Sequence, residues 1–74
     1  MSVYFTINGR TFETTQRWLP AADLLRLAGL DPGCYDLGEL RRHRPIPVRY
    51  GFGDIVGIRR GARFVSLDDR ADVI

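Results

Sequence analysis

The sequence predicts a small α+β domain in which one helix packs across one face of a four- to five-stranded mixed sheet. Three observations indicate this class: an alternating apolar hairpin opens the chain, one amphipathic segment follows, and β-branched and aromatic segments return after it. The length of 74 residues allows one domain with a small core. We place this domain at residues 1–67 and a flexible acidic tail at residues 68–74.

The first predicted element is a hairpin. Residues 2–8 are mostly β-branched or aromatic, which favours a strand, and residues 11–15 form the returning strand. Between them, Asn8 and Gly9 supply the two positive-φ positions of a tight turn. The alternation predicts which side chains share a face: Val3, Phe5 and Ile7 on one side, Tyr4 and Thr6 on the other.

The second predicted element is a helix of about ten residues, too short to be stable without docking on the sheet. Its apolar stripe consists of residues spaced i, i+3, i+4 and i+7, namely Ala21, Leu24, Leu25 and Ala28. Pro20 suits the first helical position, and Gly29 suits a left-handed C-terminal cap. In the crossing segment before the helix, we expect Trp18 to be a core residue or a lid on the helix.

The remaining strands follow the helix. Residues 35–40 read as a third strand, and residues 45–48 as a short edge strand, because their two prolines cannot donate to a ladder. Residues 54–56 fit either an extended piece or a single helical turn. Residues 62–67 form the last strand.

Charge is unevenly distributed along the chain. Residues 41–63 carry seven arginines against Asp54 alone, which gives +6, while the segments on either side are each −2. All 11 basic residues are arginine, so the sequence contains no side-chain amine. The basic segment would attract an acidic partner surface or a phosphate backbone, or would serve only as a solvated surface.

Catalytic chemistry is not expected. Cys34 and His43 are the single cysteine and the single histidine, both in predicted loops, so neither an internal disulfide nor a zinc site is plausible. We therefore expect no enzyme activity, no metal and no cofactor. The apolar runs are too short to span a bilayer, so we expect a cytoplasmic protein with no membrane partner.

Several motifs of this chain resemble the bacterial multiubiquitin domain. The opening FTINGR with the following FE resembles the first hairpin of that family. The run LLRLAGLDP and the later YDL resemble its helix and third strand, as do DIVGI and GARF near the end. The similarity extends over residues 3–67, and its specificity comes from the order and spacing of short motifs.

The resemblance implies a ubiquitin-like β-grasp fold and a modifier role in a bacterial ubiquitination-like operon, in some cases one of phage defence. The implied partners are an activating-enzyme-like protein, a conjugating-enzyme-like protein, a deubiquitinase-like peptidase and unidentified target proteins. In conjugation, the C-terminal carboxylate is adenylated and passed first to a thiol and then to an amine.

The end of this sequence departs from the Gly-Gly that conjugation uses. Three accounts remain open: attachment through a trimmed non-glycine end, binding without attachment, or loss of the attachment chemistry. The candidate conjugation or processing tail consists of Asp68, Asp69, Arg70, Ala71, Asp72, Val73 and Ile74.

Ubiquitin-like folds usually dock partners through the sheet face away from the helix. The residues that we expect to form an apolar centre there are Tyr4, Leu40 and Phe64, and the arginines expected around it are Arg41, Arg42, Arg44 and Arg49. An alternative function is single-stranded nucleic-acid binding by the basic segment. In that case, Tyr35, Tyr50 and Phe52 would be the stacking platforms.

Overall fold

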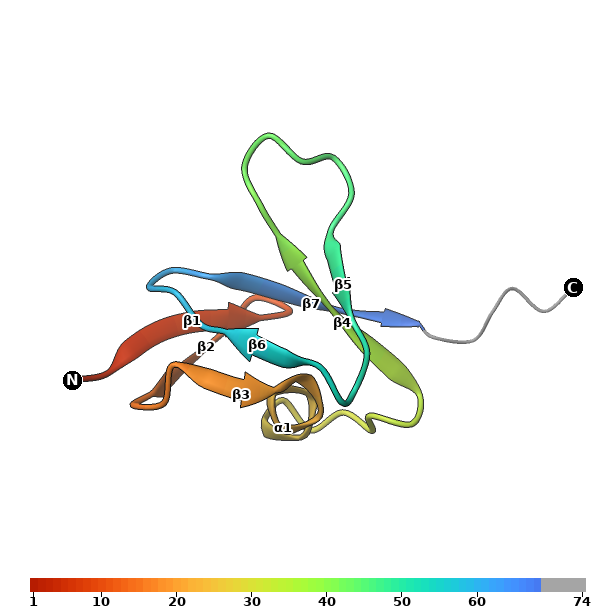
Figure 1. Cartoon of the computed structure of the whole chain (residues 1–74), viewed down its shortest axis with the longest axis horizontal. Helices are drawn as coiled ribbons and strands as arrows, with labels where there is room; N and C mark the ends of the chain where they lie inside the picture. Colours follow the sequence, from red (N-terminus) through yellow and green to blue (C-terminus); the bar gives the residue numbers. More distant parts are fainter. Residues whose placement is uncertain (69–74) are drawn as a thin grey trace, which may run out of the picture.

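The computed structural model describes residues 1–68 as a five-stranded sheet, a two-stranded sheet and one helix (Figure 1). The chain opens with a hairpin of β1 (Val3–Ile7) and β2 (Arg10–Thr14), paired antiparallel. Its turn has φ of 51° at Asn8 and 83° at Gly9, the left-handed values that an Asn-Gly turn predicts. The predicted hairpin is therefore confirmed.

The helix α1 (Ala21–Leu27) follows the short strand β3 (Trp18–Pro20) and is shorter than the ten residues expected. The residue before it, Pro20, is extended, so proline precedes the first helical position instead of filling it. Two backbone carbonyls stabilise the helix start: Ala21 donates its N–H to Asp54, and Ala22 donates to Phe52.

The end of α1 follows the predicted cap. Gly29 has φ of 80°, and its N–H donates to the Arg26 carbonyl at 2.9 Å. The next N–H, of Leu30, donates to the Leu25 carbonyl at 2.9 Å. These two bonds make a Schellman motif, which returns Leu30 toward the core.

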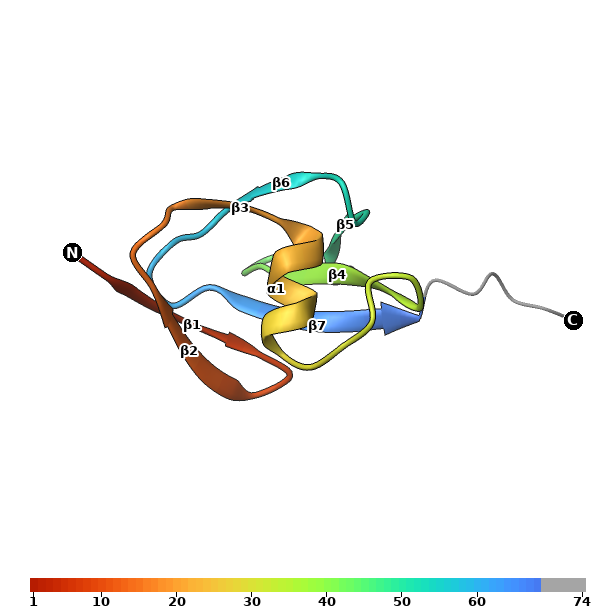
Figure 2. The ribbon, with the colours of Figure 1, turned by 90° about the horizontal axis from the view of Figure 1, so that it is seen from below.

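The sheet contains β4 (Tyr35–Leu40), β5 (Val48–Tyr50) and β7 (Arg63–Asp68) in addition to the hairpin. The strand order is β2-β1-β7-β4-β5, with β1 and β7 parallel and every other neighbouring pair antiparallel. The sheet is thus mixed, and its first and last strands lie side by side at its centre. Figure 2 shows α1 in front of one face of this sheet.

The smaller sheet pairs β3 with β6 (Ile55–Gly57) in antiparallel register. Residues 54–56, which fitted two interpretations in the sequence, are thus mainly extended.

The prediction of a strand at residues 45–48 was largely wrong, because the paired strand begins only at Val48. The prolines at 45 and 47 precede it, and β5 does lie at the sheet edge.

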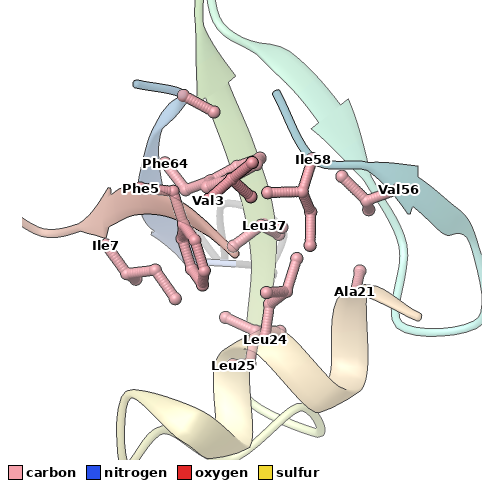
Figure 3. Packing of buried hydrophobic residues seen from close by; sticks show 11 residues of the cluster. Val3, Phe5, Ile7, Ala21, Leu24, Leu25, Leu37, Val56, Ile58 and Phe64 are labelled. Atoms are coloured by element: carbon pink, nitrogen blue, oxygen red, sulfur yellow. The ribbon is translucent and has the colours of Figure 1, made fainter. Parts of the chain in front are cut away.

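The core lies between the helix, the smaller sheet and one face of the larger sheet (Figure 3). Phe5 stacks on Phe12 with ring centroids 5.9 Å apart and meets Phe64 edge-on at 6.0 Å. From α1, Leu24 and Leu25 are fully buried, as the stripe predicted. The remaining buried residues of the cluster are Val3, Ile7, Ala21, Leu37, Val56, Ile58 and Ala62.

Candidate functional site

One face of the larger sheet packs on the helix, and we call the opposite face the exterior face. Because side chains alternate along a strand, residues next to core positions point to it. On β7, Phe64 is buried in the core, so Arg63 and Val65 point the other way. The exterior face comprises Tyr4, Thr6, Thr11, Glu13, Asp36, Gly38, Leu40, Arg49, Arg63, Val65 and Leu67.

An apolar strip crosses this face at Gly38. A Cβ placed on Gly38 would lie 2.8 Å from Leu67 Cδ1 and 3.2 Å from Pro47 Cβ, so both side chains pack directly on the glycine backbone. Val65 lies opposite Gly38 on β7, and Leu40 lies two residues further along β4. Four apolar side chains, Leu40, Pro47, Val65 and Leu67, therefore share one surface. All four are half-buried.

Arginines border this strip. Arg63 lies directly opposite Leu40 on one side and Thr6 on the other, so its exposed side chain is central on the face. Arg49 forms an ion pair with Asp36 of the adjacent strand. Within residues 1–68, Arg63 makes no ion pair, so its guanidinium is available to a partner carboxylate.

A buried carboxylate fixes the base of the arginine-rich loop 41–47. Glu39 is 5% exposed and lies on the helix-side face, opposite Phe64. The guanidinium of Arg41 donates to Glu39 Oε1 at 2.9 Å, and the Tyr50 hydroxyl donates to the same oxygen at 3.1 Å. The hydrogen bond to Glu39 raises the pKa of Arg41 above its ordinary value, so the guanidinium remains charged.

Tyr50 gives this cluster an alkaline pH dependence. Burial, followed by the hydrogen bond to Glu39, raises the pKa of the Tyr50 hydroxyl above its ordinary 10.0. A group whose pKa is higher in the folded state than in the unfolded state makes its full contribution to stability at pH values below its unfolded-state pKa. That contribution is lost as pH rises through its folded-state pKa. We therefore expect the free energy of unfolding to fall as pH increases beyond 10. In Tyr50→Phe the fall should be shallower in urea titrations at pH 8 to 11. An identical slope in both proteins would contradict the role of this hydroxyl.

The structure places the predicted docking residues in four different locations. Tyr4 is 56% exposed on the exterior face, where Leu40 and Arg49 also lie. Arg42 and Arg44 are exposed in the loop 41–47, whereas the Arg41 guanidinium contacts the helix-side Glu39.

The prediction for Phe64 was wrong. Its ring is 1% exposed and packs against Phe5, so it belongs to the core and not to a docking surface. In the candidate tail, Asp68 is the last residue of β7, one residue beyond the predicted strand end. The tail residues 69–74 lie outside the described part of the chain.

Sequence reasoning missed Arg63, Val65 and Leu67. Side-chain alternation in the last strand could have identified these three residues. If Phe64 is placed in the core, the odd-numbered residues of that strand fall on the exterior face. It also missed the exposure of Trp18, which was expected in the core or on the helix and is 70% exposed.

The two reactive side chains lie in different loops. Cys34 is exposed, with its Sγ 3.6 Å from an Asp31 carboxylate oxygen, and His43 is exposed in the arginine-rich loop. Residues 1–68 contain no group of three or more His, Cys, Asp or Glu side chains placed to hold a metal ion.

An open pocket of about 200 Å³ lies beside the end of the helix α1. Its lining is Arg26, Asp31, Pro32, Gly33 and Phe52.

The short helix α1 is not long or apolar enough to cross a membrane, and it is the one helix within residues 1–68. Comparison with protein-family models, with curated proteins and with solved structures finds no match to this chain.

Proposed function

We propose that this chain is a ubiquitin-like β-grasp protein of a bacterial ubiquitination-like operon, acting as a modifier or as a modifier-derived binding partner. Its exterior face would dock the activating-enzyme-like and conjugating-enzyme-like proteins, and a deubiquitinase-like peptidase would act on the product. By the same resemblance, the operon would serve in phage defence. Nothing in the proposal requires catalysis by this chain.

The observation that carries the proposal is the topology. A hairpin leads to one helix across the sheet, and β7 returns in parallel beside β1 to give the order β2-β1-β7-β4-β5. This arrangement, with the last strand at the centre of the sheet, is compatible with a β-grasp. The motifs that resemble the multiubiquitin domain lie on these elements and on β6 (Ile55–Gly57) of the smaller sheet.

The exterior face supports a docking role. It combines a half-buried apolar strip with exposed Tyr4 and with Arg63, which is free of ion pairs among the described residues. Protein interfaces commonly have such an apolar centre with arginine and tyrosine anchors. A partner with acidic residues around an apolar contact would fit it.

The docking surface is tested by charge reversal at Arg63. We expect Arg63→Glu to weaken binding to the activating-enzyme-like protein of the same genome at least ten-fold, because the new carboxylate meets acidic partner groups. The control is Arg26→Glu on the exposed side of the helix. Calorimetry measures both affinities, and equal losses in the two variants would contradict docking through the exterior face.

Attachment is tested separately by intact mass spectrometry after incubation with ATP and the candidate partner enzymes. A modifier should gain a covalent adduct, or should lose part of its tail and then gain one. An unchanged mass with retained binding would identify a partner that is never attached. An unchanged mass without binding would overturn the proposal.

Nucleic-acid binding is the second candidate, and the structure favours it less. Two of its three expected stacking residues, Tyr35 and Tyr50, are half-buried against the core, and the Tyr50 hydroxyl is bonded to Glu39. Of these three residues, only Phe52, which is 64% exposed, presents its ring to solvent. Binding to oligo-thymidine that falls steeply between 50 and 200 mM salt would restore this candidate.

A further inference from the structure

A second surface, on the smaller sheet, presents the only tryptophan of the chain to solvent. Trp18 is 70% exposed, yet its ring is held in place. A Cβ on Gly57, directly across the strand pair, would lie 2.9 Å from Trp18 Cζ3 and 3.2 Å from Cη2. The ring therefore packs on the glycine backbone of the opposite strand, while most of the side chain stays exposed.

The strand register makes this an apolar surface. Leu19 and Val56 pair with each other and face the core. Their neighbours Trp18, Pro20 and Ile55 consequently point away from the core. Ile55 is 57% exposed, so a large aliphatic group and a large aromatic group lie on one small sheet. Exposed apolar groups gathered in this way are typical of interaction sites.

Three arginines adjoin the tryptophan end of this sheet. Arg17 precedes Trp18, and its carbonyl accepts the Ile58 N–H at 2.8 Å, which brings the following Arg59 and Arg60 to the same end. All three are exposed, and none forms an ion pair with another residue of the range 1–68. We call these arginines together with Trp18, Pro20 and Ile55 the Trp18 surface.

We propose that the Trp18 surface binds an acidic segment of a partner protein, with an apolar side chain of that segment seated on Trp18 and Ile55. Three unpaired guanidiniums complement carboxylates, and the aliphatic and aromatic groups complement an apolar side chain. The occupant is a peptide and not a nucleic acid, because the positive charge is confined to one end. At the other end Asp54 is exposed, and it would repel a continuing phosphate backbone.

This surface is separate from the exterior face. The Trp18 surface lies on the outer side of the smaller sheet, which consists of β3 and β6. The exterior face belongs to the larger sheet (Figure 2). One molecule could therefore contact two partners at once. The inference does not depend on the proposed ubiquitin-like function, since it rests only on the smaller sheet and its arginines.

The test begins with selection of random 12-residue peptides on the full chain by display. The best peptides are then titrated while the fluorescence of Trp18, the sole tryptophan, is recorded. We expect net-acidic peptides with at least one large apolar residue, and a change in Trp18 emission on binding. The double variant R59S/R60S should bind them at least ten-fold more weakly, and the control R42S/R44S should bind them as the parent does.

Three outcomes would overturn the inference. Selection could yield no acidic peptides, or the selected peptides could bind R59S/R60S as tightly as the parent. Ten-nucleotide oligo-thymidine could also bind with a lower Kd than every selected peptide, which would assign the surface to single-stranded nucleic acid. Thermal melting of each variant shows that a lost affinity does not come from unfolding.

Discussion

Replacing Phe64 with alanine is expected to remove most of the free energy of unfolding of this domain, while replacing Tyr4 with alanine changes its stability little. Phe64 is 1% exposed and contacts Phe5 at the centre of the core. Truncation of such a ring costs about 3–5 kcal/mol. Small domains have free energies of unfolding near the lower end of about 5–15 kcal/mol, so this loss removes most of the stability of the domain.

Tyr4 is the matched control because it is also aromatic and lies on the neighbouring central strand, but on the opposite face. With 56% of its surface exposed, its removal should cost no more than about 0.5 kcal/mol. Urea unfolding of both variants, followed by circular dichroism, measures the two values. If Phe64→Ala were the milder change, Phe64 would lie on the exterior face, and the face assignment of β7 would be reversed.

The sequence predicted the local elements of this fold well because their signals are chemical and short-range. An Asn-Gly turn requires two positive φ values, and Asn8 and Gly9 have them. Gly29 likewise ends the helix through a left-handed cap, as its position after the apolar stripe indicates. The third strand was predicted with the same bounds that β4 has, Tyr35–Leu40.

The faces of the last strand could not be predicted in the same way. β7 lies between β1 and β4, and central strands carry apolar residues on both sides. Phe64, Val65 and Leu67 are all apolar, so the alternation that identifies a face in β1 is absent here. A choice of register that differs by one residue exchanges the core side and the exterior side, which is how Phe64 was misassigned.

The smaller sheet was missed because its pairing is non-local. β3 and β6 have three residues each and are separated by more than thirty residues of sequence. Strands of this length carry no measurable period, and no turn signal connects them. The exposure of Trp18 follows from that pairing, since Gly57 provides the flat backbone on which the ring lies. The Trp18 surface could therefore not be predicted from the sequence.

The second large effect is expected at Arg41. Removal of the Arg41 side chain leaves the Glu39 carboxylate, which is 5% exposed, with the Tyr50 hydroxyl as its one remaining side-chain partner among residues 1–68. A buried charge that loses a charged hydrogen-bond partner is costly, and we expect Arg41→Ala to lower the free energy of unfolding by about 2–3 kcal/mol. The neighbouring Arg42→Ala is the control, because Arg42 is exposed and has no ion pair among the described residues.

The cost at Arg41 should come from the carboxylate left behind and not from the lost pair itself. Apolar side chains of similar volume often replace a buried ion pair without loss of stability. The double variant Glu39→Met with Arg41→Ala should therefore recover to within about 1 kcal/mol of the parent, since methionine packs beside Phe64 and Val48. A double variant that is as unstable as Arg41→Ala would show that the pair itself stabilises the fold.

If the double variant recovers stability, the remaining role of the pair is to position the loop 41–47. Arg41 connects the end of β4 to Tyr50 on β5, so its hydrogen bonds close the base of the loop that carries Arg42 and Arg44. Amide hydrogen exchange in that loop should then be faster in the double variant than in the parent, although the two melt at similar temperatures. Equal exchange would mean that β5 pairing alone orders the loop. Recovered stability with faster exchange would assign the charged pair to the presentation of the two exposed arginines, whereas unrecovered stability in the double variant would assign it to the fold.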